Sequence, residues 1–320
     1  MDGEWLRAHL PASFSGIPDE AMPAGCSVLH GKVREIVDLG DELLIVASDR
    51  VSAFDRILAL VPCKGEVLNR MSLYWFAITR DIVANHVVEM VTPRAMRVRK
   101  CTPLPVEVVV RGYLAGSAWR DYRDGRAVSG ITLPDGLSHN EQLPESILTP
   151  STKAQEGHDR PISEAEIVES GLVGARRWRE IREAALALYE RGRSHAAERG
   201  LVLVDTKYEF GIDDAGTLTL IDELHTPDSS RYWDARQYAD RFAAGAAQHH
   251  LDKEYLRGWL LERGYSGDGK PPRIPEDVIV ELAGRYIDAV ERVTGAEFEP
   301  MGLDPDREVD RIVDLARSTR

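Results

Sequence analysis

The 320-residue sequence has few cysteines and no long apolar segment. Its three cysteines, Cys26, Cys63 and Cys101, are odd in number and widely spaced, and no C-x-x-C occurs, so neither a disulfide framework nor a zinc site is expected. No segment approaches the roughly 18 apolar residues of a membrane-spanning helix. The first ten residues lack the basic and apolar regions of a signal peptide. We therefore expect a cytoplasmic protein.

Positive charge is also in deficit, and several common catalytic motifs are missing. Lys and Arg total 40 against 53 Asp and Glu, which gives a formal net charge of −13. Such a chain does not attract a nucleic-acid backbone by its overall field, so an anionic ligand needs a local basic pocket. The sequence contains no G-x-x-x-x-G-K-[ST], no G-x-S-x-G and no H-E-x-x-H. A Walker-type phosphate loop, a nucleophile elbow and a zincin site are thereby excluded.

Residues 201–222 are predicted to form two strands joined by a tight turn, because apolar segments flank a D-D-A-G sequence. If Ile212 faces Thr217, then Lys207 lies opposite Asp222. Alternate residues of a strand share a face, so charged side chains would gather on a face that also carries leucines. The charged residues are Asp205, Lys207, Glu209 and Asp222, and the leucines are Leu201, Leu203, Leu218 and Leu220.

Two interpretations of this charged group remain open from the residues alone. One is a buried lysine–aspartate pair with solvated charges at the ends of the hairpin, because ion-pair networks also collect charges. The other is a site for a hard divalent cation with oxygen ligands, which would balance three carboxylates against one lysine.

Basic residues occur at two further places where strands and turns are expected. Residues 31–47 predict a hairpin with Lys32 and Arg34 on one face, which would hold phosphates or form a solvated surface. Residues 106–110 predict a buried strand interrupted by one polar residue. Arg111 and Ser117 at the two ends of the following glycine-containing turn would suit a phosphate, or belong to an ordinary turn.

The remaining pattern predicts several helices between polar loops. Ser163 and Glu166 resemble a capping box. The amphipathic segments expected to be helical are residues 66–83, 118–123, 176–199, 234–244, 252–262 and 276–293. We expect residues 1–25 to be irregular and residues 296–320, which are highly charged, to be peripheral.

Six segments resemble the SAICAR synthetase (phosphoribosylaminoimidazole-succinocarboxamide synthase) family, in the family's order. They are G-K-V-R at 31–34, S-A-F-D at 52–55, L-P-V-E-V-V-V-R-G-Y-L-A-G-S at 104–117, T-P-S-T-K at 149–153, V-D-T-K-Y-E-F-G at 204–211, and D-E at 222–223 with T-P-D-S-S-R-Y-W at 226–233. The long segment 130–161 resembles the longer, eukaryote-like branch. Each motif alone is weak, but six in order are specific.

The resemblance implies an α+β, two-lobed SAICAR-synthase fold related to ATP-grasp and kinase folds, with antiparallel sheets and flanking helices. An N-terminal lobe, residues 1–107, would carry the phosphate-binding hairpin. A C-terminal lobe, residues 108–320, would carry a metal-binding hairpin and the helices. The implied activity is a carbon–nitrogen ligation of purine biosynthesis, in which ATP, L-aspartate and carboxyaminoimidazole ribotide (CAIR) give SAICAR, ADP and phosphate through an acyl phosphate. The partners are these small molecules, with neither nucleic acid nor membrane expected.

The resemblance also assigns site residues to the nucleotide and the metal. Lys32, Arg34 and Lys153 would neutralise ATP phosphates. Val108 and Val110, in a hinge segment, would meet adenine through the backbone. Magnesium would be held by Glu209 and Asp222, and Glu209 would also be part of the ATP site.

The acceptor side and the catalytic groups are assigned in the same way. Arg111 and Ser117 would hold the ribotide phosphate. Arg231 would hold a carboxylate, together with the substrate-binding residues Asp228 and Ser230, and the loop from Ser52 to Asp55 would close on the acceptor. Catalytic support for the metal and the transferred group would come from Asp205 and Lys207. A kinase-like phosphotransferase and a nucleotide sensor are the alternatives, and only the ligase would require aspartate.

Overall fold

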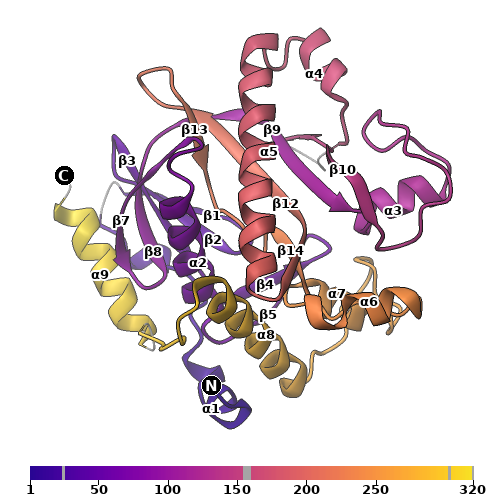
Figure 1. The fold of residues 1–320 in the computed structure, drawn as a ribbon. Helices are drawn as coiled ribbons and strands as arrows, with labels where there is room; N and C mark the ends of the chain where they lie inside the picture. Colours follow the sequence, from indigo (N-terminus) through magenta and orange to yellow (C-terminus); the bar gives the residue numbers. More distant parts are fainter. Residues whose placement is uncertain (24–25, 154–159, 302–303, 319–320) are drawn as a thin grey trace.

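The first of the two larger β-sheets in the described residues is antiparallel throughout and is built from the N-terminal part of the chain (Figure 1). The computed structural model describes residues 1–23, 26–153, 160–301 and 304–318. The strand order is β1-β2-β3-β8-β7. The strands are β1 (Val28–His30), β2 (Arg34–Asp38), β3 (Glu42–Ala47), β7 (Val87–Thr92) and β8 (Ala95–Arg99).

The second sheet has the order β10-β9-β12-β13-β6, with β11 paired to β9 and β14 paired to β12. Its pairings are antiparallel except that β13 runs parallel to β6. The strands are β6 (Ala84–Asn85), β9 (Thr102–Tyr113), β10 (Gln142–Leu148), β11 (Ser151–Thr152), β12 (Leu201–Ile212), β13 (Leu218–Ile221) and β14 (Ser230–Asp234). A separate hairpin joins β4 (Arg50–Ala53) to β5 (Arg56–Leu60). The predicted α+β class with largely antiparallel sheets is confirmed.

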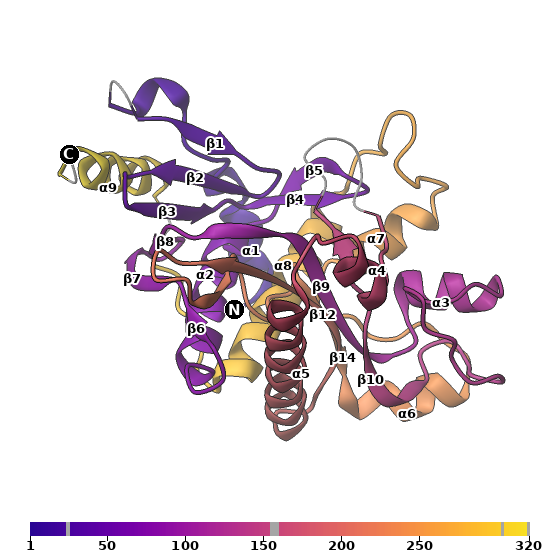
Figure 2. The ribbon, with the colours of Figure 1, turned by 90° about the horizontal axis from the view of Figure 1, so that it is seen from above.

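Helices cover both sheets. The long helix α5 (Ala175–Glu198) crosses the second sheet, and α2 (Lys64–Ile78) packs against both the first sheet and α8 (Glu276–Thr294) (Figures 1 and 2). The others are α1 (Gly3–Ala8), α3 (Gly116–Arg123), α4 (Glu164–Glu169), α6 (Ala235–Ala243), α7 (Glu254–Leu261) and α9 (Pro305–Ser318), with short 3-10 turns at Leu10–Ala12 and Asp19–Ala21. In the described residues, none of the helices has the length and apolarity to cross a bilayer.

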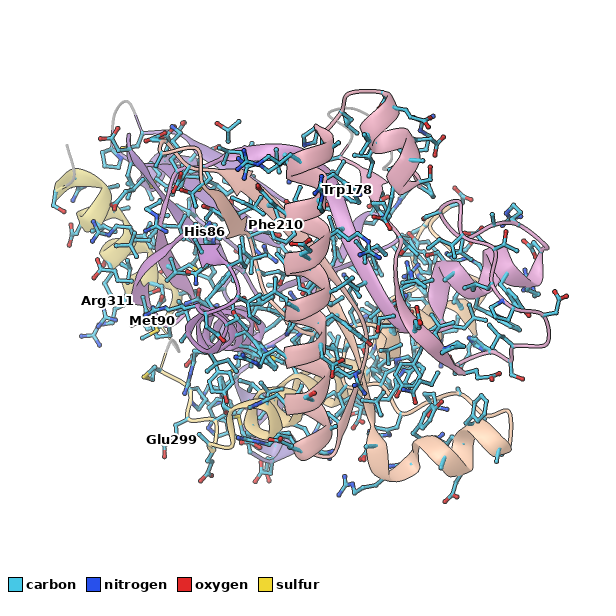
Figure 3. The ribbon with its side chains drawn as sticks, turned by 45° about the horizontal axis from the view of Figure 1, so that its top comes forward. His86, Met90, Trp178, Phe210, Glu299 and Arg311 are labelled. Carbon is cyan, nitrogen blue, oxygen red and sulfur yellow. The ribbon has the colours of Figure 1, made fainter. Side chains whose placement is uncertain are left out.

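The main core lies between α5, α2, α8 and the sheets. Trp178 on α5 and Phe210 on β12 both belong to it (Figure 3). The capping box of Ser163 and Glu166 is present at the start of α4. The predicted division of the chain at residue 107 falls inside β9, so this strand is shared by the two predicted lobes.

Both ends of the chain are more ordered than the sequence predicts. In α9, Ile312 and Ala316 are buried against Val37 and Leu44 of the first sheet, so the expectation of a peripheral tail was wrong. Its apolar residues recur at helical spacing and give one face that the sheet covers. The N-terminal residues form α1 and then bury Phe14 in the same cluster, so they are not simply irregular.

The register predicted for the central hairpin was wrong by one residue. Ile212 pairs with Leu218, and Glu209 pairs with Ile221. Phe210 packs in the core with Leu218 and Leu220, so these leucines lie on the face opposite to the charged side chains. An irregularity in the pairing of β12 with β14 between Leu203 and Asp205 changes which side chains face the core. The charged residues therefore face a cleft instead of an apolar layer.

Candidate active site

A cleft of about 800 Å³ lies where the first sheet, the β4–β5 hairpin and the second sheet meet. Thirteen of the predicted site residues line it: Lys32, Arg34, Ser52, Asp55, Arg111, Lys153, Asp205, Lys207, Glu209, Asp222, Asp228, Ser230 and Arg231. They come from segments far apart in the sequence, and the fold brings the charged residues of the central hairpin together with those that the family resemblance had added.

Arg34 joins the first sheet to the loop after β13. Its two terminal nitrogens form ion pairs with Asp222 and Glu223, and only 14% of its side chain is exposed. Burial opposes the charge, but these carboxylates raise the pKa of Arg34. Asp222 has a positive φ of 71°, so the chain leaves the strand there and turns this carboxylate towards the cleft.

Lys207 lies among acidic side chains on the cleft face of β12. Its Nζ is 2.9 Å from Glu107 and 2.5 Å from Glu209, and Glu209 also pairs with Lys153. Burial would lower the pKa of Lys207, but Glu209, Asp222 and Glu107 raise it, so the side chain is an ammonium group. Burial likewise opposes the charge of Glu209, while the two lysines lower its pKa and keep it ionised.

A second cationic group surrounds Asp205. Arg111 donates to Asp205 at 2.8 Å, to Thr149 at 2.8 Å and to Ser117 at 3.0 Å. Arg231 pairs with the same oxygen of Asp205. Among the described residues these contacts occupy three of the five N–H groups of Arg111, which leaves donors for an anion.

The glycine-containing turn brings Arg231 close to the backbone. Gly116 has a φ of 60°, and a Cβ there would lie 2.4 Å from a guanidinium nitrogen of Arg231. A side chain at this position would push Arg231 out of place, so the glycine is required for the close approach.

The β4–β5 hairpin closes one side of the cleft. Phe54 and Asp55 at its tip both have positive φ, and Asp55 pairs with Lys32. Phe54 lies under the guanidinium of Arg257, 4.9 Å from its ring centroid, and packs edge-to-face on Tyr265. The hairpin therefore touches the helical part of the chain across the cleft.

Three predicted site residues lie outside the cleft lining. The side chains of Val108 and Val110 are buried in the main core, so contact of the predicted kind would use their backbone. Val109 is the valine that faces the cleft. Ser117 is exposed and reaches the site through Arg111.

Several cleft residues were not among the predicted site residues. Glu107 and Glu223 hold Lys207 and Arg34, respectively, and Arg257 pairs with Glu254. Glu107 had a visible signal, because it is the single polar residue in a valine-rich segment. Glu254 and Arg257 sit at ordinary helical spacing on α7, and nothing in that pattern separates them from a solvated helix face.

The donor set of the cleft suits a divalent cation that shares its ligands with phosphate. Glu209, Asp222 and Glu223 present carboxylate oxygens, the ligands that magnesium prefers. Within the described part of the chain, no three His, Cys, Asp or Glu side chains converge closely enough to hold a metal by themselves. Magnesium is commonly bound by one or two carboxylates plus substrate phosphates, so the residues fit such a shared site.

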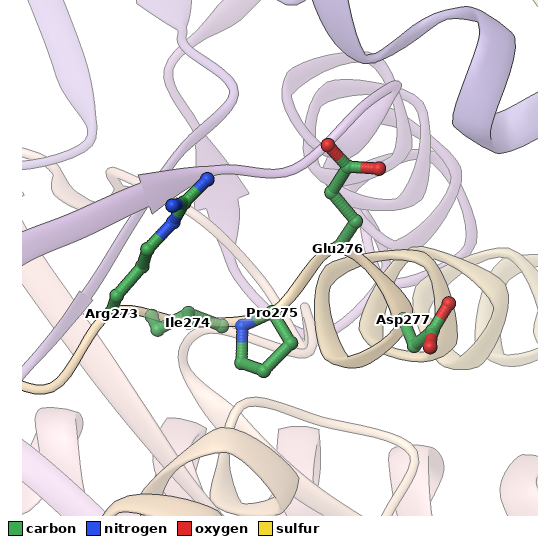
Figure 4. A pocket seen from close by; sticks show the side chains of 5 residues that line it. All are labelled: Arg273, Ile274, Pro275, Glu276 and Asp277. Carbon is green, nitrogen blue, oxygen red and sulfur yellow. The ribbon is translucent and has the colours of Figure 1, made fainter.

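A smaller pocket of about 390 Å³ lies at the start of α8 (Figure 4). Residues 273–277 line it, and none of them borders the cleft. Its Asp277 is engaged by Arg7. The charged groups described above are therefore concentrated in the cleft and not in this pocket.

Comparisons with known proteins identify the family of this chain. The sequence model of the SAICAR synthetase family matches residues 27–274. The phosphoribosylaminoimidazole-succinocarboxamide synthase of Legionella pneumophila (strain Lens) is 48% identical over 289 residues, which cover 88% of this chain and 92% of that protein.

Solved structures agree as well. The SAICAR synthase of Saccharomyces cerevisiae complexed with SAICAR is 34% identical with a TM-score of 0.77, covering 89% of this chain and 99% of that one. A SAICAR synthetase in complex with ADP is 26% identical with a TM-score of 0.67, covering 86% and 100%. The match spans both sheets and the cleft between them, and the chain belongs to the SAICAR synthetase family.

Proposed function

We propose how the cleft carries out the activity of this family, the ATP-dependent ligation of L-aspartate to the carboxylate of CAIR, which gives SAICAR, ADP and phosphate. The observation that carries the proposal is the pairing of opposite charges across one cleft. Arg34 of the first sheet and Lys153, directly after β11, meet carboxylates of β12 and of the loop after β13, while a second cationic group stands around Asp205. A phosphate-bearing substrate at each end of the cleft would account for both groups of cations.

The phosphates of ATP would bind the cationic side chains that pair with carboxylates in this structure. Lys32, Arg34 and Lys153 can turn from Asp55, Asp222 and Glu209 to phosphate oxygens. Glu209 and Asp222 would then hold Mg²⁺, which would neutralise phosphate charge. We place adenine against β9, with Val108 and Val110 offering backbone groups because their side chains are buried.

The ribotide phosphate would bind at the opposite end. Arg111 has N–H groups available, and Ser117 adds a hydroxyl at the start of α3. Arg231, which is held by Asp205 and lies close to Gly116, would bind a carboxylate of the acceptor or of aspartate, with Ser230 next to it. The loop from Ser52 to Asp55 would cover the acceptor.

The reaction then consists of two displacement steps: ADP is displaced first, and phosphate second. A carboxylate oxygen of CAIR attacks the γ-phosphorus and ADP leaves, which gives an acyl phosphate. The aspartate amine attacks the acyl carbon, phosphate leaves, and the amine loses a proton. Lys207 is an ammonium group, so it would stabilise the transferred phosphoryl group and would not accept that proton. Asp205 would keep Arg111 and Arg231 in position.

A coupled assay tests the proposal. ADP release and SAICAR formation are measured with ATP, CAIR and aspartate, and with each acceptor omitted in turn. ADP should form at a useful rate only with CAIR present, and SAICAR only with aspartate added. Equal ATP turnover without CAIR would overturn the assignment. The cytoplasmic location, the division into lobes at residue 107 and the kinship with ATP-grasp and kinase folds stay predictions of the sequence.

A further inference from the structure

A fully buried lysine lies behind the cleft and has no place in the roles described so far. Lys64 is the first residue of α2, and its side chain is 0% exposed. Burial lowers its pKa, and the nearby charge of Lys253 acts in the same direction. A helix N-terminus also favours anions over cations. Residues that break local rules in this way occur chiefly at functional positions.

Asp228 and Tyr286 complete the surroundings of this lysine. The Nζ of Lys64 is 2.7 Å from Oδ2 of Asp228, and the hydroxyl of Tyr286 donates to Oδ1 at 2.6 Å. Burial would raise the pKa of Asp228, but the charges of Lys64 and Lys253 lower it to about 2, so it is a carboxylate. We call Lys64, Asp228 and Tyr286 the rear cluster. Both carboxylate oxygens in it have partners inside the protein.

The backbone next to Lys64 is fixed to the first sheet. The N–H of Gly65 donates to Oδ1 of Asp49 at 2.8 Å, and Arg94 donates to the same oxygen at 3.1 Å. A Cβ at Gly65 would lie 2.2 Å from the carbonyl oxygen of Ala47, so α2 begins directly against β3. Lys64 therefore projects from a helix start that is held against the sheet that also carries Arg34.

Asp228, in turn, is bonded into the loop 222–231. Its N–H donates to the hydroxyl of Thr226 at 3.2 Å, and that hydroxyl donates to Glu223. The next residue, Ser229, accepts from the N–H of Lys207 at 2.9 Å. The loop presents Asp222 and Glu223 to the cleft at one end and Arg231 at the other.

We propose that Lys64 is a positioning residue of the ligation reaction. Its ion pair with Asp228 fixes the position of the loop 222–231 relative to β2 and β3. Asp222 and Glu223 at one end of the loop and Arg231 at the other are thereby held in position to bind their ligands at the same time. This rests on the proposed function of the cleft. Asp228 then acts through the loop it belongs to and not by touching substrate.

The main test replaces Lys64 by a side chain of similar length without charge. Lys64→Met should lower kcat about 100-fold, because misplacing reacting groups by about 1 Å has an effect of that size. The Kd for ADP, measured by calorimetry, should change by less than about threefold, and the KM for CAIR should rise less than kcat falls. A merely structural role would instead leave kcat per folded molecule unchanged and lower only the unfolding midpoint.

Two further variants test the pair itself. Asp228→Asn should lower kcat by a similar factor. The double variant Asp228→Asn with Lys64→Met should lower kcat by no more than about the larger of the two single effects, because the residues act as a unit. Lys100→Met is the matched control, since it removes a lysine from an exposed pair with Asp38 at 2.7 Å on the first sheet. It should keep the kcat of the unaltered protein.

Tyr286→Phe decides the question if Lys64→Met fails to fold. It removes one hydrogen bond to Asp228 and should lower kcat about tenfold with the folded state preserved. Unchanged kcat in Tyr286→Phe, or in a folded Lys64→Met, overturns the inference while the ligase activity stands. An unaltered protein that makes no SAICAR overturns the proposed function, and this inference with it.

Discussion

Two groups of ion pairs connect the loop 222–231 to the first sheet and to the start of α2 beside it, and they differ in what surrounds them. In the cleft, Arg34 meets Asp222 and Glu223, with 25% of the Asp222 side chain exposed. In the rear cluster, the Lys64 side chain is 0% exposed and Asp228 is enclosed by two donors. The same residue types thus occur once with a partly exposed carboxylate and once in a nearly buried pair, of which only Asp228 borders the cleft.

This difference separates charges that can exchange partners from charges that cannot. A cleft cation can leave a carboxylate for a phosphate oxygen, because a ligand can enter and keep both charges neutralised. A buried pair that loses one partner leaves an uncompensated charge, which is strongly destabilising. The cleft pairs are therefore suited to chemistry and the rear cluster to fixing position. Four predictions test this contrast.

The largest expected effect is on turnover in Asp222→Asn. We expect kcat to fall about 10³-fold, the size seen when one preorganised electrostatic group is removed from an active site. Glu223 still pairs with Arg34, so the unfolding midpoint should shift by no more than about 2 °C. Steady-state kinetics and a thermal melt check both parts. Asp214→Asn, in the exposed turn of the same hairpin, is the control and should behave as the unaltered protein.

The next effect is on stability in Asp228→Asn. The free energy of unfolding should fall by about 3–5 kcal/mol, because Lys64 is left buried without its counter-charge. Urea unfolding measures it, with Asp222→Asn in the same series expected to change by less than about 1 kcal/mol. Equal losses in the two variants would remove the distinction between the cleft and the rear cluster.

Arg111→Ala tests whether the cations around Asp205 can also leave a carboxylate to bind a ligand anion. The KM for CAIR should rise about 100-fold, or about 3 kcal/mol, because a charged contact to the ribotide phosphate is lost. The KM for ATP should stay within about threefold. A raised KM for ATP with an unchanged KM for CAIR would move this turn to the nucleotide side.

The smallest expected effect is the acid dependence of stability. Burial lowers the pKa of both His86 and His225 to about 3, and Arg34 adds to the effect at His86. The unfolded chain binds protons at these residues from about pH 6.5 while the folded chain does not, so stability falls as the pH drops. Each histidine should contribute about 2 kcal/mol of loss between pH 7 and pH 5.

His86→Gln separates the two histidines. It should remove about half of that pH dependence in urea unfolding at pH 7 and pH 5. It keeps a polar side chain at the position while removing the titrating ring. A stability that does not change between these pH values would contradict the neutral, buried state of both rings.

Much of the fold follows from patterns that act locally. The helix expected at residues 176–199 is α5 (Ala175–Glu198), and the valine-rich strand lies inside β9. Periodicity predicted these elements because each buries one face of a regular repeat. The register of the central hairpin was missed because the loop takes in Thr217 as well as D-D-A-G, with the side chain of Asp213 accepting from the N–H groups of Ala215 and Thr217, which the sequence pattern does not mark.

The site itself was predicted unevenly. Residues in motifs, such as Arg111 and Lys207, line the cleft, and the roles that the family resemblance implies for them stay predictions. Lys64 carries no signal, because a single lysine at the start of an amphipathic segment is typical of a solvated helix end. Its partner Asp228 lies 164 residues away, so only the folded chain shows the pair. Because α9 is rich in charged residues, its apolar face was also not recognised from the sequence.

The most direct test of the contrast is a magnesium titration of turnover in Asp222→Asn and Asp228→Asn side by side. We expect Asp222→Asn to need a higher magnesium concentration for half-maximal rate, because it has lost a ligand of the metal. Asp228→Asn should reach a lower kcat at the magnesium concentration that the unaltered protein needs. A normal magnesium requirement in Asp222→Asn would contradict the claim that the cleft carboxylates can leave their cationic partners to bind magnesium.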